Sequence, residues 1–307
     1  FYFPTKDNFQ PKFTHTDWGI AEQIVVEDPN KANKKALEIL NKGVSHLIFR
    51  LELPLSKKET SILLEGIGLA YIRVDFKGPG LDQDFLNHFN GFIEDSKQDK
   101  NKIKGFFYFN PFNYLLQFGQ YKYNEKTDFE HFYSAIATPS SAHQKWIVGG
   151  GKFHNAGATA TQQLAFILAE LSELIHSIKD NGLEVNATDI GFHLELGTHY
   201  FMEIAKFRAL RSLVKEVFQA YGLEQTEIHI HAETDYRHLT VYDPEVNLLR
   251  TTTQAMSAVL GGCNSLRVRP FDAAYANAND FSSRLARNIQ LILKGESYMD
   301  KVADPAA

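Results

Sequence analysis

The sequence contains almost no cysteine: Cys263 is the only one in 307 residues. A single cysteine excludes an internal disulfide bond and suits a reducing compartment, so we expect a cytoplasmic location. Also absent are an apolar run long enough to cross a membrane and a basic-then-apolar signal at the amino terminus. The formal net charge is −5, without a block of like charges, which argues against a nucleic-acid partner or a membrane surface.

A glycine-rich phosphate loop is missing after the first of eight candidate strands, which argues against the alternative of an open doubly wound sheet. The candidates are short β-branched or aromatic runs at residues 20–26, 46–52, 71–76, 105–110, 144–150, 189–196, 227–234 and 265–271. Each is followed by an amphipathic stretch, and strict alternation of strand and helix predicts a parallel sheet. Eight such units predict an α/β fold, a closed (β/α)8 barrel over residues 16–307, with a short N-terminal extension over residues 1–15.

Three of the amphipathic stretches have clear helix signals. Residues 158–182 and 198–222 both end in glycine, which favours the left-handed conformation that terminates helices. Residues 243–262 open with Asp243 and Pro244, which predict a helix cap followed by a first-turn proline.

Alternate positions of the candidate strands are apolar, and in a barrel this face packs against the helices. The other face would line the interior, and the residues predicted there are Arg50, Glu52, Arg73, Asp75, Tyr108, Asn110, His193, Glu195, His229, His231, Glu233, Arg267 and Arg269. Most barrel interiors are layers of branched aliphatic residues, and buried charge is unfavourable unless paired. We expect the four arginines to pair with the four carboxylates and to block the interior, although a wet, ligand-holding tunnel is the alternative.

The stretch "EIHIHAET", residues 227–234, puts His229, His231 and Glu233 on one face of a strand. With His193, they could bind a metal ion, as in a metal-dependent barrel hydrolase. One histidine could instead act as an acid or base at the carboxyl end of the barrel, or all could belong to a structural ionic network. Because arginines are expected nearby and disfavour a cation, we predict that His193, His229 and His231 bind no metal.

Four motifs in the second half of the chain occur in the order found in methylmalonyl-CoA mutases. They are "HNAGATATQQLAF", "YFMEIAKFRA", "DPEVNLLRTTTQAMSAVLGG" and "FSSRLARNIQLIL". The chain resembles that family from about residue 15 to its end. The resemblance implies a (β/α)8 barrel joined to a C-terminal cobalamin-binding domain, and radical isomerisation of methylmalonyl-CoA and succinyl-CoA with adenosylcobalamin. The sequence begins without Met and stops at "VADPAA" without a helix cap, so we expect it to be a barrel cut from a longer polypeptide. It has no D-x-H-x-x-G motif, so we expect the cobalamin-binding domain to be absent from it.

Within that resemblance, His231 stands where the active chains have a catalytic histidine in H-x-Q-T-S-G-W. Glu233 replaces the glutamine, and Asp189 stands where those chains have an arginine suited to a substrate carboxylate. We expect both acids to repel that carboxylate. "HNAGA", "HAETDYRHLT" and "VRPFDAA" resemble the small, non-catalytic chains of the heterodimeric bacterial enzymes.

The resemblance therefore implies a cytoplasmic isomerase complex of propionate metabolism, in which the partner is a homologous catalytic large subunit that binds adenosylcobalamin. This chain is expected to bind neither a cofactor nor acyl-CoA and to be inactive alone. The alternative within the family is a competent mutase chain that binds CoA along the barrel axis.

Overall fold

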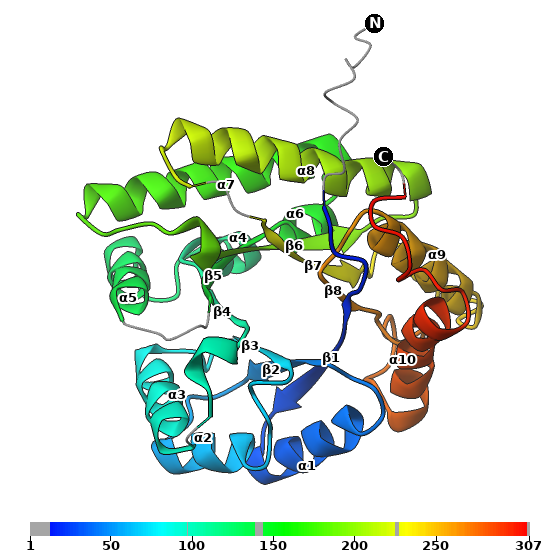
Figure 1. Cartoon of the computed structure of the whole chain (residues 1–307), viewed down its shortest axis with the longest axis horizontal. Helices are drawn as coiled ribbons and strands as arrows, with labels where there is room; N and C mark the ends of the chain where they lie inside the picture. Colours follow the sequence, from blue (N-terminus) through cyan, green and yellow to red (C-terminus); the bar gives the residue numbers. More distant parts are fainter. Residues whose placement is uncertain (1–12, 97, 139–143, 225–226, 306–307) are drawn as a thin grey trace, which may run out of the picture.

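The computed structural model describes residues 13–96, 98–138, 144–224 and 227–305. Eight parallel strands close into a barrel in sequence order, with β1 paired to both β2 and β8 (Figure 1). The strands are β1 (Gly19–Val26), β2 (His46–Leu51), β3 (Arg73–Lys77), β4 (Phe106–Phe109), β5 (Gln144–Gly149), β6 (Ile190–Leu196), β7 (His229–Thr234) and β8 (Ser265–Arg267). The predicted (β/α)8 barrel is confirmed.

Helices surround the barrel on its outer side (Figure 1). They are α1 (Pro29–Leu40), α2 (Lys57–Leu64), α3 (Gln83–Ser96), α4 (Phe112–Phe118), α5 (Glu125–Ala137), α6 (Gly151–Asn155), α7 (Ala160–Asp180), α8 (Tyr200–Ala220), α9 (Val246–Leu260) and α10 (Asp280–Gly295), with short 3-10 turns η2 (Lys100–Lys102) and η3 (Ala187–Asp189). Among the described residues, no helix is long and apolar enough to cross a membrane.

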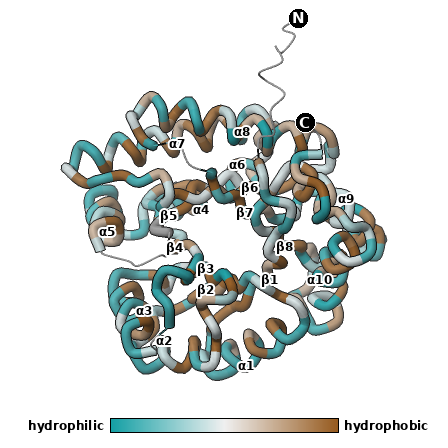
Figure 2. Tube along the Cα trace, viewed as in Figure 1, coloured by the Kyte–Doolittle hydropathy of each residue, from teal (hydrophilic) through white to brown (hydrophobic). Residues whose placement is uncertain are grey.

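The hydrophobic core lies between the strands and the helices, as the alternating pattern predicted. Phe49, Phe76 and Phe107 face outward from neighbouring strands and pack with Phe85 and Phe89 of α3. On the opposite side of the barrel, strand residues such as Trp146 and Phe192 pack against α7 and α8. Hydrophobic and hydrophilic segments alternate along the helices in Figure 2, as expected for helices with one face on a sheet.

Two predicted helix ends are confirmed, because Gly182 and Gly222 follow α7 and α8 with φ of +70° and +68°. The predicted start of α9 at Asp243 and Pro244 is wrong. Its first helical residue is Val246, and Asp243 accepts a turn hydrogen bond from its N–H. The Asn247 side chain accepts a hydrogen bond from the Thr240 N–H and donates one to the Thr240 carbonyl oxygen. These two bonds hold the loop before α9 in a non-helical path.

The predicted N-terminal extension lies mostly outside the described residues, but its last part is visible. Phe13 is buried against Gly262, and the Arg211 guanidinium lies 5.4 Å from its ring centroid. His15 bonds the Gly262 carbonyl oxygen at 3.1 Å. This part of the extension therefore packs beside the loop before β8.

Candidate functional site

The carboxyl half of the barrel interior holds a network of ion pairs. Glu233 of β7 lies beside Glu195 of β6 and Arg267 of β8 in the strand register. Arg267 contacts the Glu233 carboxylate directly, and Arg269 lies 3.0 Å from Glu233 and 2.8 Å from Glu195. Burial opposes ionisation of Glu233, but the two arginines and Lys77 outweigh it and hold its pKa well below the usual range. Burial raises the pKa of Glu195 to about 7, helped by the charge of Glu233.

A second network occupies the amino half of the interior. Asp75 of β3 is fully buried, lies 3.0 Å from His46 and 3.3 Å from Arg73, and accepts the N–H of Phe106 at 2.8 Å. Burial would raise the pKa of Asp75, but His46 and Arg73 lower it further than burial raises it. The predicted pairing of Arg73 with Asp75 is confirmed, as is that of Arg267 and Arg269 with Glu195 and Glu233. His46 was not among the predicted interior residues, although it lies four positions before Arg50 on β2 and therefore faces the same side of the strand.

The interior histidines lie between these two networks. His231 is 1% exposed, its Nδ1 lies 2.8 Å from Ser265 Oγ, and its ring lies 5.3 Å from that of His46 and 5.4 Å from that of His193. Burial lowers the pKa of His231 well below 6.5, so the ring is neutral at neutral pH. His229 Nε2 lies 3.4 Å from the same serine oxygen. The His231 ring is therefore packed against those of His46 and His193, and both His231 and His229 lie beside Ser265.

His193, His231 and Glu233 could together hold a metal ion, because one ligand atom of each lies within 4.8 Å of the others. The Glu233 carboxylate is, however, already engaged by two arginines. A cation there would have to displace them or tolerate their repulsion. The absence of metal from these histidines stays a prediction.

The carboxyl mouth of the barrel is more open than its middle. Arg50 and Glu52 pair at 2.9 Å as predicted, but their side chains are 45% and 32% exposed. Lys77, also missed in the sequence analysis, lies 5.7 Å from the Tyr108 ring, and burial lowers its pKa to about 8. Tyr108 in turn lies edge-on to His193 at 6.2 Å.

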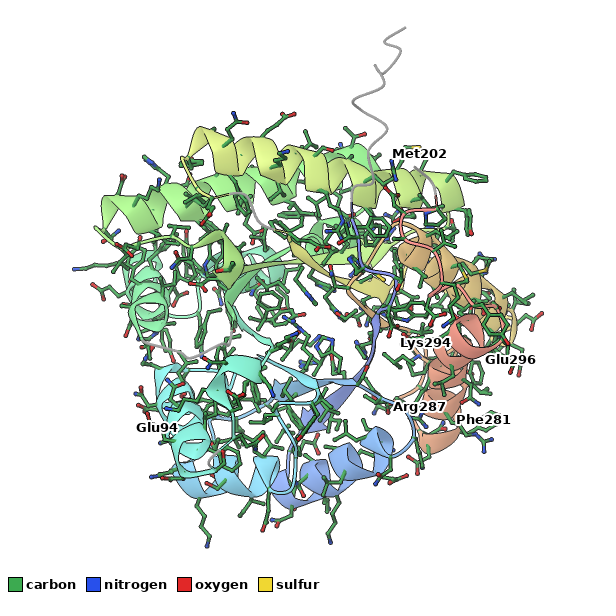
Figure 3. All side chains as sticks on the ribbon, viewed as in Figure 1. Glu94, Met202, Phe281, Arg287, Lys294 and Glu296 are labelled. Carbon is green, nitrogen blue, oxygen red and sulfur yellow. The ribbon has the colours of Figure 1, made fainter. Side chains whose placement is uncertain are left out.

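Side chains fill the interior unevenly. The ring of Phe106 lies over Gly191, so a Cβ built on Gly191 would come within 2.1 Å of it. A Cβ on Gly149 of β5, by contrast, would meet no atom within 4 Å. Many side chains project from the strands into the enclosed space (Figure 3). The two networks and the ring of Phe106 therefore occupy the amino end and the middle, and space remains beside β5.

Two expectations about this interior are wrong. Asn110 follows the end of β4, and its side chain turns outward, where it donates to the Ile147 carbonyl oxygen and to Glu170 of α7. Asp189 ends η3 immediately before β6, six residues before Glu195. At about 3.3 Å per residue, this places Asp189 about 20 Å along the strand from the level of Glu233, so the two acids cannot repel one substrate carboxylate together.

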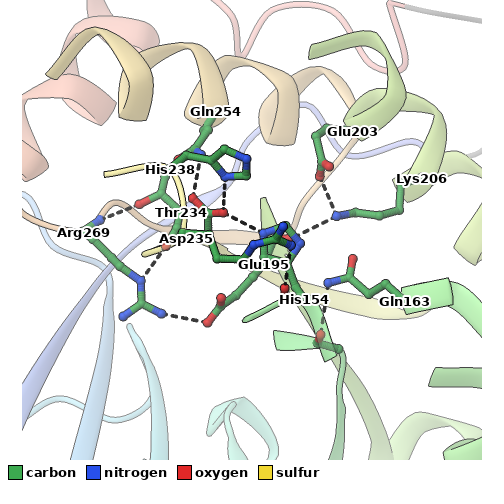
Figure 4. Close-up of polar contacts among 12 residues, drawn as sticks. His154, Gln163, Glu195, Glu203, Lys206, Thr234, Asp235, His238, Gln254 and Arg269 are labelled. Carbon is green, nitrogen blue, oxygen red and sulfur yellow. Dashed lines mark hydrogen bonds and ion pairs between the residues drawn. The ribbon is translucent and has the colours of Figure 1, made fainter. Parts of the chain in front are cut away.

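A further polar cluster lies where β5 and β7 end (Figure 4). The buried carboxylate of Asp235 bonds His154 at 2.7 Å, His238 at 2.5 Å and Gln254 at 2.9 Å. Burial would raise the pKa of Asp235, but these three hydrogen bonds lower it. These three residues were not predicted to lie together from the sequence, where His154 is 81 residues from Asp235.

Fold and interior together define a (β/α)8 barrel protein whose centre holds paired ionic groups in place of the usual aliphatic layers. The chain belongs to the methylmalonyl-CoA mutase family, since the family model described as "Methylmalonyl-CoA mutase" matches residues 55–307.

Three curated relatives extend this assignment. The methylmalonyl-CoA mutase small subunit of Porphyromonas gingivalis is 38% identical over 305 residues, which cover 95% of this chain and 49% of that protein. The methylmalonyl-CoA mutase of Rhizobium meliloti is 41% identical over 52% of this chain and 23% of its own length. The probable small subunit of Mycobacterium bovis is 39% identical over 52% of this chain and 27% of its own length. The chain thus spans about half the length, or less, of these relatives.

Proposed function

We propose that this chain is the barrel of a small subunit of methylmalonyl-CoA mutase, and that it supports a homologous catalytic large subunit without carrying catalysis itself. The complex would interconvert methylmalonyl-CoA and succinyl-CoA, with adenosylcobalamin bound by the large subunit. The similarity to one small subunit over 95% of the chain supports the subunit assignment. One observation carries the structural role: the pairing of Glu233 of β7 with Arg267 of the neighbouring strand β8 and with Arg269 just beyond it, in the carboxyl half of the barrel interior.

The ion pairs support this role because an acyl-CoA lying along the axis would have to lie against these charged side chains of β6, β7 and the end of β8. Glu233 is 1% exposed, Arg269 is 6% exposed and the Arg267 side chain is 14% exposed, so the pairs themselves offer little accessible surface to a ligand. Separating buried partners leaves uncompensated charge in a site that excludes water, which costs several kcal/mol. The chain would therefore resist a substrate on its axis.

His231 supports the same view. An acid–base role requires a histidine that changes protonation near neutral pH and reaches the substrate. His231 is buried, its pKa is lowered well below 6.5, and its Nδ1 is held by Ser265. His231 thus occupies the position of the family's catalytic histidine, but its contacts are those of a buried, packed side chain.

A competent mutase chain is the second candidate, and the open space beside Gly149 favours it. Equilibrium dialysis of the chain with CoA and with succinyl-CoA separates the two proposals. The structural role predicts no saturable binding of either ligand up to millimolar concentration. Saturable binding that Gly149→Phe abolishes, in a variant with the circular dichroism spectrum of the wild type, would overturn the proposed structural role.

A further inference from the structure

The cluster around Asp235 joins three segments that are distant in the sequence. His154 belongs to the short helix α6 after β5, Asp235 follows the last residue of β7, and His238 lies three residues farther on. One carboxylate oxygen, Oδ2, meets Nε2 of His154 at 2.7 Å and Nδ1 of His238 at 2.5 Å. Two imidazole nitrogens and a carboxylate oxygen therefore converge at one place (Figure 4).

These three groups suit a divalent transition metal ion. Imidazole nitrogen and carboxylate oxygen are ligands of Zn²⁺ at about 2.0–2.2 Å, so ligand atoms around a tetrahedral ion lie about 3.3 Å apart. The observed separations of 2.7 and 2.5 Å are those of hydrogen bonds and are shorter than this ligand spacing. A shift of about 0.6 Å at the His154 contact and about 0.8 Å at the His238 contact would open the site.

Neighbouring residues hold the ligands in the way that metal sites require. Gln254 of α9 donates to Oδ1 of Asp235 at 2.9 Å, which leaves Oδ2 directed at the histidines. Arg237 donates to the main-chain carbonyl oxygen of His154 at 3.0 Å and so fixes the end of α6. Partners of this kind orient metal ligands and raise their affinity.

Charge distinguishes this cluster from the one inside the barrel. Glu233 is neutralised by Arg267 and Arg269, whereas within the described part of the chain the ion pairs of Asp235 are with His154 and His238 alone. The nearby Lys206 is paired with Glu203 at 2.6 Å. Among the described residues, the carboxylate of Asp235 therefore forms no ion pair with an arginine or lysine that a metal ion would have to displace.

A metal ion could reach the cluster from the side of His238, which is the most exposed of the three residues. Its side chain is 29% exposed, while that of Asp235 is fully buried and that of His154 is 8% exposed. An ion that entered from the His238 side would keep water or a small ligand as its fourth partner.

We propose that His154, Asp235 and His238 form a binding site for a divalent transition metal ion, Zn²⁺ above all, at the carboxyl end of the barrel. The site stands independently of the proposed subunit role, because it uses none of the interior residues on which that role depends.

The test is a zinc titration of the chelator-stripped chain against a chromophoric competitor, with circular dichroism as the control for folding. We expect one Zn²⁺ per chain, and we expect His154→Ala and His238→Ala each to weaken binding at least tenfold. Gln254→Leu should weaken it about tenfold through the lost hydrogen bond to Asp235. Co²⁺ in place of Zn²⁺ should give the visible spectrum of a tetrahedral site.

Two histidine variants serve as matched controls. His176→Ala removes an exposed histidine that pairs with Asp180 on the surface of α7, and His193→Ala removes the interior candidate. Both should leave zinc binding unchanged. The proposal is overturned if the wild-type chain binds no zinc at tens of micromolar, if binding survives in folded His238→Ala, or if His193→Ala abolishes it.

Discussion

At the scale of single residues, the stability of the barrel interior depends on the pairing of each buried charge with an opposite charge. Arg269 serves two carboxylates at 2.8 and 3.0 Å, and Glu233 accepts two arginines, so each group compensates more than one neighbour. A pair at the solvent-exposed mouth, such as Arg50 and Glu52, gains much less because water screens it. Substitutions at the two levels should therefore differ in effect.

Replacement of Glu233 by leucine should lower the free energy of unfolding by about 3–5 kcal/mol, because Arg267 loses its buried partner and Arg269 keeps only Glu195. Glu52→Leu is the matched control at the exposed mouth, where we expect a loss below about 1 kcal/mol. Urea unfolding measured by circular dichroism gives both values. Equal losses in the two variants would show that the interior pairs contribute no more than surface pairs.

Glu170 of α7 predicts a pH effect on stability. Burial raises its pKa from 4.5 to about 7, although hydrogen bonds from Asn110 and the Gly149 main chain partly oppose this. Between these two pH values the unfolded chain releases the proton and the folded chain retains it, so stability falls as pH rises from about 4.5 to about 7.

The variant Glu170→Gln should lose this dependence. Relative to the wild type, it should gain about 3 kcal/mol between pH 4.5 and pH 7.5, since 2.5 pKa units correspond to about 3.4 kcal/mol. Urea unfolding of both proteins at several pH values measures the difference. A constant difference across this range would mean that Glu170 titrates normally in the folded chain.

At the scale of elements, the packing of β4 against β6 inside the barrel depends on Gly191 of β6, which leaves room for the ring of Phe106 of β4. The ring of Phe106 occupies the place where a Cβ on Gly191 would lie, and the same ring packs 5.4 Å from that of His229 and under the Arg73 guanidinium at 4.4 Å. The close approach of β6 to this ring depends on the missing side chain.

The variant Gly191→Ala should therefore cost about 1–3 kcal/mol, because the added methyl group displaces Phe106 from a packed interior. Gly149→Ala on the adjacent strand adds the same methyl group where no atom lies within 4 Å, and it should be neutral or slightly stabilising. Phe106→Leu should recover part of the loss in the Gly191→Ala background. Equal thermal midpoints for the two alanine variants would contradict this packing.

The strands, and the side of the sheet that most of their side chains face, could be predicted from the sequence, because both depend on the order of residues within one short segment. Short β-branched or aromatic runs predicted all eight strands, and charge on the inner face predicted pairs such as Arg73 with Asp75. Asn110 was misplaced because β4 ends one residue earlier, at Phe109, and alternation has no meaning beyond a strand end. His154 and Asp235 are 81 residues apart, and only the packing of β5 near β7 brings them together.

At the scale of the whole molecule, the chain has the family's fold, and we propose that it does not have the family's catalytic activity. The barrel is that of the methylmalonyl-CoA mutase family, and its interior contains buried ion pairs. The chain alone should then neither bind adenosylcobalamin nor interconvert the two acyl-CoAs. Its contribution to a complex would be a folded surface on which a catalytic homologue is stabilised.

The most direct test is turnover in a reconstituted heterodimer. The full-length small chain, as wild type or His231→Ala, is mixed with the catalytic large chain, and isomerisation of methylmalonyl-CoA is measured after size-exclusion chromatography has verified assembly. Because His231 is buried against His46, His193 and Ser265, we expect the variant to be less stable. Its turnover should remain within about twofold of the wild type. A loss of more than about tenfold in a folded, assembled heterodimer would show that this histidine still takes part in the chemistry.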